Sequence, residues 1–412
     1  MTLAALTARG DRYSAADLHD KARELKRRRI EWLHWGWLCV AAALGLSIGG
    51  ILINARLITA SGEANYALRQ TAFLGIAVMA GAVVALPHYR RLHRLSTPLL
   101  VLVLGLLIFV LIPWVPDSIV HPRNGARRWI SLGVMDFQPS ELAKIAYIIA
   151  LSSYLRYREN YRRFFGLLRP LVLTFIPMGL ILVEPDLGSA MLFLPTLFAM
   201  LIAAGAKLKH LVLIVALGLA AAPAMYPLLK PHQKDRIHAL YYQIRGDRRH
   251  VQDIGYQGDK AMTLVGAGQV TGAGAEKAAD LVEYNHLPER HNDMVFAVIA
   301  CRWGLVGALA TWGLYLLALM GGMLTAARCK EPFGRLVSVG IVAILFAQMT
   351  INTGMTIGLM PITGMTLPFV SYGGSSLVAG WIMVGLLVNI AMRRPQYLIR
   401  ESFEFDNKPV EA

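Results

Sequence analysis

The sequence predicts an all-α polytopic membrane protein with about ten transmembrane helices. Its 412 residues are 56% hydrophobic and have a mean hydropathy of +0.49, which excludes a soluble domain with an ordinary core. Apolar runs such as 97–115 and 211–229 are long enough to cross roughly 30 Å of hydrocarbon at about 1.5 Å per residue. The alternating segments of about ten residues that mark a transmembrane β-barrel do not occur.

Residues 1–32 are expected to form a cytoplasmic tail before the first span. The segment is polar, lacks a signal-peptide pattern and contains the basic run Lys21-Ala-Arg-Glu-Leu-Lys-Arg-Arg-Arg29, which favours retention inside the cell. The formal net charge of +15 would also suit nucleic acid, but basic loops of membrane proteins usually set orientation and meet anionic headgroups. We therefore expect membrane lipids, and no nucleic acid, beside these charges.

Apolar segments then follow one another along the chain. The predicted spans are approximately 33–55, 66–86, 97–115, 139–155, 168–183, 187–204, 211–229, 294–326, 337–358 and 374–392. Because an even number of spans returns the chain to its starting side, both termini are predicted to be cytoplasmic. The expected organisation is a basic tail (1–32), a membrane domain (33–395) and a short C-terminal tail (396–412).

The charge of the short connections agrees with this orientation. The connections on the side of the tails are His88–Arg94, Arg156–Arg169, Lys207–Lys209, Arg328–Lys330 and Arg393–Arg394. The positive-inside rule places such basic connections in the cytoplasm. The connection 231–293, between the seventh and eighth spans, is then a large extracytoplasmic loop, because it is far too long for a simple connector.

Polar strings interrupt the apolar pattern on the opposite, outer side. They are Asn124-Gly-Ala-Arg-Arg-Trp-Ile130, Glu184-Pro-Asp-Leu-Gly188 and Leu287-Pro-Glu-Arg-His-Asn-Asp293. Charged groups at the edge of hydrocarbon are costly unless they are paired or functional. We therefore expect a polar site at the outer surface of the membrane.

Asp293 is the leading candidate for chemistry, because it stands directly before a long apolar span. His291, two residues earlier, could orient the carboxyl or tune its pKa. Helix capping explains Asp293 equally well, since aspartate is a favoured N-cap residue. His291 could also be simply solvated.

Arg127 and Arg128 place two guanidinium groups side by side on the face where positive charge is disfavoured. Such a pair suits a phosphate or pyrophosphate ligand, and contact with lipid headgroups fits equally well. Trp129 is more typical of an interfacial anchor than of a substrate platform.

Glu141 and Lys144 stand three residues apart at the start of the predicted span 139–155, so they share a helical face. A charged cavity floor is favoured over an ion pair that merely points into the bundle, because intramembrane charges are costly. Asp186, in contrast, follows a proline before a new span and is predicted mainly as a helix N-cap.

The stretch Leu359–Ser376 contains prolines, glycines and several hydroxyl groups. These residues predict non-helical backbone, which is tolerated at membrane depth only where it is buried in protein or lines a polar cavity. Ser375, near its end, is predicted to cap the last span.

Five strings resemble those of the SEDS family (shape, elongation, division and sporulation), in the same order. They are Asn124–Ile130, Gln138-Pro-Ser-Glu141 with Lys144, Glu184–Gly188, Leu287–Asp293 and Pro368-Phe-Val-Ser-Tyr-Gly-Gly-Ser-Ser376. The resemblance covers nearly the whole chain, and the order makes it specific. Leu287-Pro-Glu-Arg-His is similar to the rod-shape branch, RodA, more than to the division branch, FtsW.

This resemblance implies a peptidoglycan glycosyltransferase that polymerises lipid II at the outer face of the cytoplasmic membrane, for cell elongation. It implies a class B penicillin-binding protein as the partner that supplies the transpeptidase. A divalent cation, Mg²⁺ or Mn²⁺, is associated with activity in the family, although the sequence shows no ligand cluster. No organic cofactor is expected.

The resemblance also assigns roles. Asp293 matches the family's essential aspartate, and Arg128 and Trp129 fall in its essential outer-loop motif. The leaving group would be undecaprenyl pyrophosphate, which is stable as an anion, so the second carboxyl that many glycosidases need is not required. Asp293 is then the candidate general base for an inverting reaction, and Arg127, Arg128 and Lys144 are candidates for stabilising the pyrophosphate.

The chain departs from the family pattern at three places. Cys301-Arg302-Trp303-Gly304 stands where an acidic pair is common, Asn292 replaces the usual threonine, and Gly268-Gln269 replaces a pair of glycines. The first departure changes the charge inside the eighth span and bears on packing, partner contact or the field near the site.

Other functions fit parts of the same pattern. A lipid-linked precursor transporter would need polar groups along its whole path, whereas the sixth and seventh spans are almost purely apolar. A non-catalytic scaffold for a transpeptidase and a polymerase of another lipid-linked sugar remain alternatives. The clustering of charge at the outer end favours surface chemistry.

Overall fold

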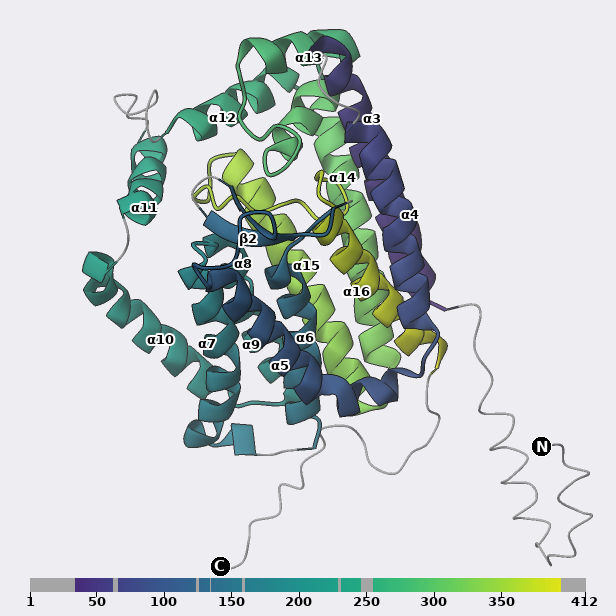
Figure 1. Cartoon of the computed structure of the whole chain (residues 1–412), viewed down its shortest axis with the longest axis vertical. Helices are drawn as coiled ribbons and strands as arrows, with labels where there is room; N and C mark the ends of the chain where they lie inside the picture. Colours follow the sequence, from purple (N-terminus) through teal and green to yellow (C-terminus); the bar gives the residue numbers. More distant parts are fainter. Residues whose placement is uncertain are drawn as a thin grey trace, which may run out of the picture.

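The computed structural model describes residues 34–61, 66–123, 126–133, 135–157, 160–228, 231–245 and 255–393. The predicted tails and the start of the Asn124–Ile130 string lie outside them. A helix forms at each place where the sequence predicts a span (Figure 1).

The helices at the predicted spans follow the chain order. They are α3 (Gly36–Ser61), α4 (Tyr66–Ala85), α5 (Leu92–Leu111), α6 (Pro139–Leu155), α7 (Leu168–Val183), α8 (Leu187–Met191) with α9 (Phe193–Ala204), α10 (Leu208–Met225), α14 (Val295–Arg328), α15 (Pro332–Thr356) and α16 (Gly374–Met392). In the described residues, eight helical segments are long and apolar enough to cross a membrane. The count of ten crossings stays a prediction, because α6 has only 17 residues and the apolar part of α10 ends at Ala221.

The centre of the bundle is formed by α15 and α16. In their most apolar windows, 78% and 72% of the residues are buried, against 22% in α4 and in α5. α15 packs against α14, α9 and α6, while α16 packs against α4 and α3. A helix that is apolar all round and buried belongs to a core, whereas the exposed apolar faces of α4 and α5 are suited to hydrocarbon.

The first and last described helices meet at one end of the bundle. A Cβ added to Gly36 would lie 3.2 Å from the Cα of Val388, so α3 starts beside the end of α16. At the same end the guanidinium of Arg328 lies 4.8 Å from the ring centroid of Trp35, and Asn389 accepts a hydrogen bond from the backbone N–H of Tyr89. The start of the first described helix and the end of the last therefore lie on the same side of the bundle, which agrees with an even number of crossings.

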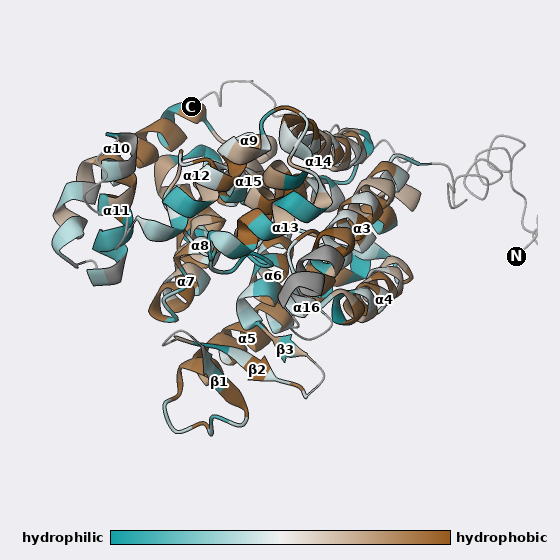
Figure 2. Cartoon of the chain, turned by 90° about the horizontal axis from the view of Figure 1, so that it is seen from above, coloured by the Kyte–Doolittle hydropathy of each residue, from teal (hydrophilic) through white to brown (hydrophobic). Residues whose placement is uncertain are grey.

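A small antiparallel sheet lies at the margin of the helices (Figure 2). Its strands, in spatial order, are β1 (Val120–Arg123), β2 (Ala126–Ser131) and β3 (Asp136–Phe137). β2 contacts α5 and α6, and β3 contacts α16. The sequence did not predict these strands, because such short segments owe their pairing to neighbouring elements and not to their own periodicity.

The long loop between α10 and α14 is largely helical. It contains α11 (Pro231–Ile244), α12 (Tyr256–Gly268) and α13 (Ala275–Tyr284). α12 and α13 pack on α14, and together they cover the end of the bundle opposite the chain ends (Figure 1).

α14 is broken at Gly304, whose backbone has φ 63° and ψ −156°. A break in a helix leaves backbone N–H and C=O groups without their usual partners. Here the loop after α12 supplies new partners on both sides of the break. The bonds run from Ala273 N to Cys301 O (2.9 Å), from Gly274 N to Arg302 O (3.2 Å), from Leu305 N to Gln269 O (2.9 Å) and from Val306 N to Val270 O (3.2 Å).

This docking brings two of the sequence departures together. Gly268 packs so closely on α14 that an added Cβ would lie 1.9 Å from the carbonyl oxygen of Ala300, and Gln269 accepts one of the bonds. Arg302 donates from Nη1 to the carbonyl oxygen of Leu52 on α3 at 3.2 Å. The Cys301–Arg302 change therefore lies at a joint between α3, α14 and the loop.

Candidate active site

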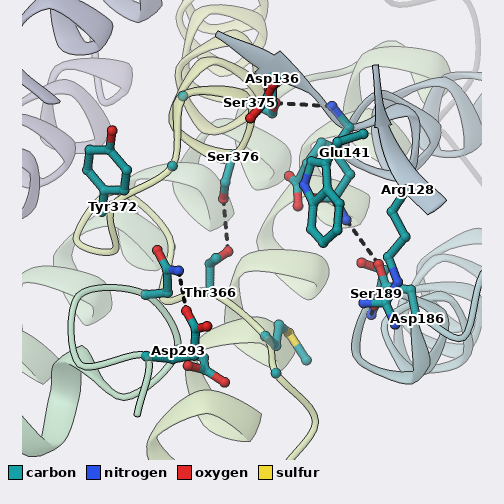
Figure 3. Close-up of a pocket in the computed structure, with 18 of the residues that line it drawn as sticks. Arg128, Asp136, Glu141, Asp186, Ser189, Asp293, Thr366, Tyr372, Ser375 and Ser376 are labelled. Atoms are coloured by element: carbon teal, nitrogen blue, oxygen red, sulfur yellow. Dashed lines mark hydrogen bonds between the residues drawn. The ribbon is translucent and has the colours of Figure 1, made fainter. Parts of the chain in front are cut away.

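A cavity of about 1030 Å³ lies where the N-terminal ends of α6, α8, α14 and α16 converge, beside β2 and β3 (Figure 3). Helix N-termini present unpaired N–H groups and positive dipole ends, which suit anionic ligands. The predicted site residues in its wall are Arg128, Trp129, Glu141, Asp186, His291, Asp293 and Ser375. The three outer strings of the sequence therefore converge on one cavity.

Asp293 is held just before α14, and its side chain is buried. Its Oδ1 has no hydrogen-bond partner among the described residues. Its backbone carbonyl accepts a bond from Nδ2 of Asn352 on α15, at 2.9 Å. The carboxyl therefore lines the cavity with one buried oxygen unpartnered, while its backbone is tied to the core.

Burial raises the pKa of Asp293 to about 7, and the nearby charge of Glu289 adds to the rise. The backbone N–H groups of Asp293 and Met294 and the guanidinium of Arg236 oppose it. A carboxyl with a pKa near neutrality is a good proton acceptor at physiological pH, because about half of the molecules carry the ionised form and that form is still basic.

Arg236 on α11 is a cavity residue that the sequence did not point out. Its Nη1 donates to the carbonyl oxygen of Thr363 at 3.3 Å. Burial and the charge of Arg128 lower its pKa, while Asp293 and Asp186 raise it. Arg236 therefore lies in the electrostatic field of both Asp293 and Asp186. Nothing in its local sequence distinguishes it from the other charged residues of the 231–293 loop.

Arg128 reaches from β2 to the turn between α7 and α8. Its Nε donates to the carbonyl oxygen of Glu184 at 2.7 Å, and its Nη2 donates to that of Pro185. The guanidinium also lies 5.9 Å from the ring centroid of Trp129. Backbone bonds leave the positive charge of Arg128 uncancelled, so it remains available to an anion in the cavity.

Beneath Arg128, the carboxyl of Glu184 is buried, and neither of its oxygens has a hydrogen-bond partner in the described chain. Burial raises the pKa of Glu184 to about 8, with a further rise from Asp186 and an opposing effect of Arg128. Glu184 does not line the cavity.

Asp186 acts as the N-cap of α8, as its sequence position predicted. Its Oδ1 accepts a bond from the backbone N–H of Ser189 at 3.1 Å. Its Oδ2 accepts from Nε2 of Gln138 at 3.1 Å and from the hydroxyl of Ser140 at 3.4 Å. The carboxylate is thus fully engaged in joining α8 to the start of α6.

Ser375 serves as a bridge. Its hydroxyl donates to the carbonyl oxygen of Asp136 in β3 and accepts from the backbone N–H of Gln138 at 3.1 Å. The structure shows no side-chain cap by Ser375 on α16. Ser375 instead ties the small sheet and α6 to the start of α16.

Glu141 and Lys144 form a buried ion pair on α6, with 2.8 Å between Nζ and Oε1. Glu141 lines the cavity, whereas Lys144 lies behind it. The pair therefore provides one polar wall with little net charge.

Arg127 differs in its surroundings from Arg128 and Trp129, its neighbours in the sequence. Arg127 donates to the carbonyl oxygens of Pro113 (3.0 Å) and Val115, and its Nη1 lies 3.8 Å from the carboxylate of Asp117. It does not line the cavity, whereas Trp129 does.

His291 belongs to an aromatic cluster on the opposite wall. Its ring stacks on Tyr66, with 4.8 Å between centroids, and meets Tyr372 edge-on at 6.0 Å. Tyr66 also begins α4, from which Arg69 lines the same wall. Arg69 is a cavity residue that was not predicted, although a charged residue inside the predicted span 66–86 was a usable signal.

The arrangement combines a buried carboxyl that has an unpartnered oxygen with cations across the cavity (Figure 3). Such a site can remove a proton from one group and stabilise developing negative charge on another. For a divalent cation the fit is poorer. Among the described residues no group of three or more His, Cys, Asp or Glu side chains is placed to hold a metal ion.

Known proteins resemble this chain over nearly its full length. Residues 32–396 match a family described as "Cell cycle protein", which covers FtsW, RodA and SpoVE. The probable peptidoglycan glycosyltransferase FtsW of Coxiella burnetii is 31% identical over 377 residues, covering 89% of this chain and 98% of the relative. Stage V sporulation protein E of Bacillus subtilis is 32% identical over 330 residues, covering 79% and 87%.

Solved structures show the same fold. A chain from a structure reported as structural coordination of polymerization and crosslinking by a peptidoglycan synthase complex is 31% identical, with a TM-score of 0.73 and coverage of 88% of this chain and 98% of that one. The rod shape determining protein RodA of Thermus thermophilus is 29% identical, with a TM-score of 0.65 and coverage of 89% and 99%. The chain therefore belongs to the SEDS family, the FtsW/RodA/SpoVE family of cell cycle proteins.

Proposed function

We propose that this protein is a peptidoglycan glycosyltransferase that polymerises lipid II into glycan strands, with Asp293 as its general base. The observation that carries the proposal is the buried Asp293 carboxyl, with an unpartnered oxygen, in a cavity that also holds Arg128 and Arg236. Several relatives are named probable peptidoglycan glycosyltransferases, which supports the reaction class.

In the proposed reaction, Asp293 accepts the proton of the 4-hydroxyl of the acceptor GlcNAc. The hydroxyl oxygen forms a bond to the anomeric carbon of the donor sugar, whose bond to the pyrophosphate oxygen breaks from the opposite face. The anomeric centre is inverted, and undecaprenyl pyrophosphate leaves with the electron pair. A pKa near 7 for Asp293 suits a base that must be ionised before each transfer.

Arg128 and Arg236 are the proposed cations for the leaving pyrophosphate. Both line the cavity, and each guanidinium donates to backbone carbonyl oxygens. An anion that develops between them would be stabilised without prior reorganisation. Any requirement for Mg²⁺ or Mn²⁺ would arise from the substrate's pyrophosphate, because Mg²⁺ commonly uses phosphate oxygens with few protein ligands.

The cavity's location favours chemistry at the outer membrane surface over transport. It lies at the end of the bundle opposite the start of α3 and the C-terminal end of α16. If the chain ends are cytoplasmic, as the basic connections predict, the cavity opens outward from the cytoplasmic membrane. A transporter would instead need polar groups along the length of the bundle.

We also propose a class B penicillin-binding protein as the partner. The support is the likeness to a chain of a peptidoglycan synthase complex in which polymerization and crosslinking are coordinated. A role in cell elongation follows from the Leu287-Pro-Glu-Arg-His string, while the curated relatives include proteins named FtsW and a sporulation protein.

The test is polymerisation of lipid II by the purified full-length protein with a candidate class B partner, in the presence of Mg²⁺ or Mn²⁺. Asp293→Asn keeps the size of the side chain and removes the base, so we expect loss of glycan chains by a factor of about 100 or more. Asp280→Asn, on the exposed face of α13, is the matched control and should polymerise at the wild-type rate. A folded Asp293→Asn protein with the wild-type rate would end the base assignment.

A further inference from the structure

A buried amide on α15 joins the backbone of Asp293 to the non-helical residues 357–373, called here the 357–373 segment. Asn352 is fully buried, and its Nδ2 donates to the carbonyl oxygens of Asp293 at 2.9 Å and Met365 at 2.6 Å. An amide nitrogen has two hydrogens, and both are engaged here. A reversed amide would set its oxygen against two carbonyls, so the surroundings determine its orientation.

A hydroxyl holds the peptide on the other side of Asp293. Ser371 donates from Oγ to the carbonyl oxygen of Asn292 at 2.5 Å. In the next residue, the backbone N–H of Tyr372 donates to the carbonyl oxygen of His291 at 2.8 Å. The carbonyls of three consecutive residues that end at Asp293 are therefore bound by Asn352 or by the 357–373 segment.

The 357–373 segment is itself anchored to the bundle. Gln70 on α4 is buried and donates from Nε2 to the carbonyl oxygen of Val370 at 3.1 Å, while its own oxygen accepts from Asn54 on α3 at 2.5 Å. Tyr315 on α14 donates to the carbonyl oxygen of Pro368. Three helices thus fix the position of the segment that fixes Asp293.

The Asp293 carboxyl gains from such fixation, because burial disfavours its charged form and a freer chain would turn it toward water. Gly364 of the segment lies beside the carboxyl at the cavity wall, since an added Cβ there would lie 3.8 Å from Oδ2. Catalysis by a base depends on holding it within a fraction of an ångström of its productive position.

We propose that Asn352 and Ser371 are positioning residues, which hold the backbone of Asn292 and Asp293 so that the Asp293 carboxyl stays at the cavity wall. The proposal rests on the function proposed above, because it gives this carboxyl the acceptor hydroxyl as its target. Neither positioning residue lines the cavity, so each acts through the aspartate and not on substrate.

The chain offers a close control for Asn352. Asn389 on α16 is also fully buried, and its Nδ2 also donates to two carbonyl oxygens, those of Val84 (2.8 Å) and Pro87 (2.6 Å). It lies at the far end of the bundle from the cavity, beside Tyr89. Asn352→Leu and Asn389→Leu therefore remove the same kind of interaction, and only one of them touches the site.

The experiment measures lipid II polymerisation by each full-length variant, with the class B partner, across a range of pH. The charged groups that face Asp293 are Glu289 on its own loop and Arg236 on α11, and neither variant alters them. Wild type should lose activity as pH falls through the pKa of the base. In Asn352→Leu the Asp293 carboxyl is held less firmly and gains contact with water, so its pKa falls. The acid limb of the pH–activity profile, where activity is lost as pH falls, should therefore move to lower pH.

We expect kcat of Asn352→Leu to fall by about 10- to 100-fold, as for a displaced reacting group, while KM stays within about twofold. Asn389→Leu should lose thermal stability but keep the acid limb of wild type. If both variants show the same kcat and the same acid limb, the positioning role is wrong. If Asp293→Asn polymerises normally, the base assignment fails first, and the two failures are distinguishable.

Ser371 provides a second test in case Asn352→Leu does not fold. Ser371→Ala removes the donor to Asn292, whereas Ser371→Thr keeps a hydroxyl at the same position. The alanine variant should lower kcat and shift the acid limb in the same direction, and the threonine variant should recover both toward wild type. An unshifted limb in Ser371→Ala, with normal kcat, would overturn the proposal.

Discussion

At the residue scale, the pair Arg127 and Arg128 shows how side-chain direction separates neighbours of identical type. Both lie on β2, where successive side chains point to opposite faces. Arg128 lines the cavity, while Arg127 binds the carbonyls of Pro113 and Val115. Alternation alone does not explain the difference, because Trp129, which would share the face of Arg127, also lines the cavity. Two adjacent guanidiniums predicted a pyrophosphate site from sequence, but the strand pairing that divides them depends on distant elements.

Asp293 was predictable because a carboxyl before an apolar span is costly, whereas its base-like pKa was not. That pKa depends on burial by α15 and on Glu289 and Arg236, which only the fold brings to it. Arg236 itself was missed for the same reason. Its loop carries many charges, and no local pattern shows which of them turns inward.

Glu184 gives a prediction at this scale. Its folded-state pKa of about 8 lies above the ordinary 4.5, so between these values the unfolded chain releases a proton that the folded chain keeps. Stability should therefore fall as pH rises through this window. Glu184→Gln removes the effect, so its apparent Tm should exceed that of wild type at pH 8 by about 2–4 °C, and less at pH 5.

The measurement is thermal unfolding of the purified protein in detergent at both pH values. Glu283→Gln, at an exposed position on α13, serves as the control and should follow wild type throughout. A Tm difference for Glu184→Gln that does not change with pH would show that Glu184 is not protonated in the folded protein.

At the element scale, the break in α14 joins the 231–293 loop to the helix that carries Asp293 at its start. Apolar residues before and after Gly304 predicted a single span, and a glycine inside a helical pattern is only a weak sign of a break. The break is stabilised by the 268–274 loop, which supplies hydrogen-bond partners for the backbone groups that the break leaves unpaired. Long-range backbone pairing of this kind leaves no local periodicity.

Gly304→Ala tests the break. Residue 304 has a positive φ, and an added Cβ would lie 2.5 Å from both Gly272 N and Val270 O. We expect a destabilisation of about 1–3 kcal/mol, seen as a lower Tm in detergent, together with reduced polymerisation because the start of α14 is disturbed.

Gly218→Ala on α10 is the matched control, because nothing lies within 4 Å of an added Cβ there. Alanine favours a helix over glycine by about 1 kcal/mol, so this variant should be neutral or slightly more stable. Equal stability of Gly304→Ala and Gly218→Ala would contradict the role of the break.

At the scale of the whole molecule, the bundle has two chemically different ends. One end holds the start of α3, the end of α16 and basic side chains such as Arg90, Arg328 and Arg393, and the other holds the cavity and the helical loop. The positive-inside rule predicts that the basic end is cytoplasmic, and on this prediction the cavity faces outward.

This orientation can be tested with single cysteines in a variant whose own three cysteines are replaced. Tyr284→Cys lies on the loop beside the cavity end, where Tyr284 is 84% exposed, and Phe165→Cys lies between α6 and α7, where Phe165 is 86% exposed. In intact cells whose outer layers let the reagent reach the membrane that holds the protein, a maleimide that cannot cross that membrane should label only Tyr284→Cys. Labelling of Phe165→Cys without lysis would invert the orientation.

The sequence by itself determined the helical membrane class, the places of the helices, the family strings and the shared helical face of Glu141 and Lys144. These depend on hydrophobic length and on neighbours within one helix, which are local properties. Only the tertiary structure decided that Arg236 enters the cavity, that Arg127 leaves it, and that Asn352 holds the backbone of Asp293. Those outcomes arise from contacts between residues distant in the chain, because packing and not local periodicity sets the direction and burial of each side chain.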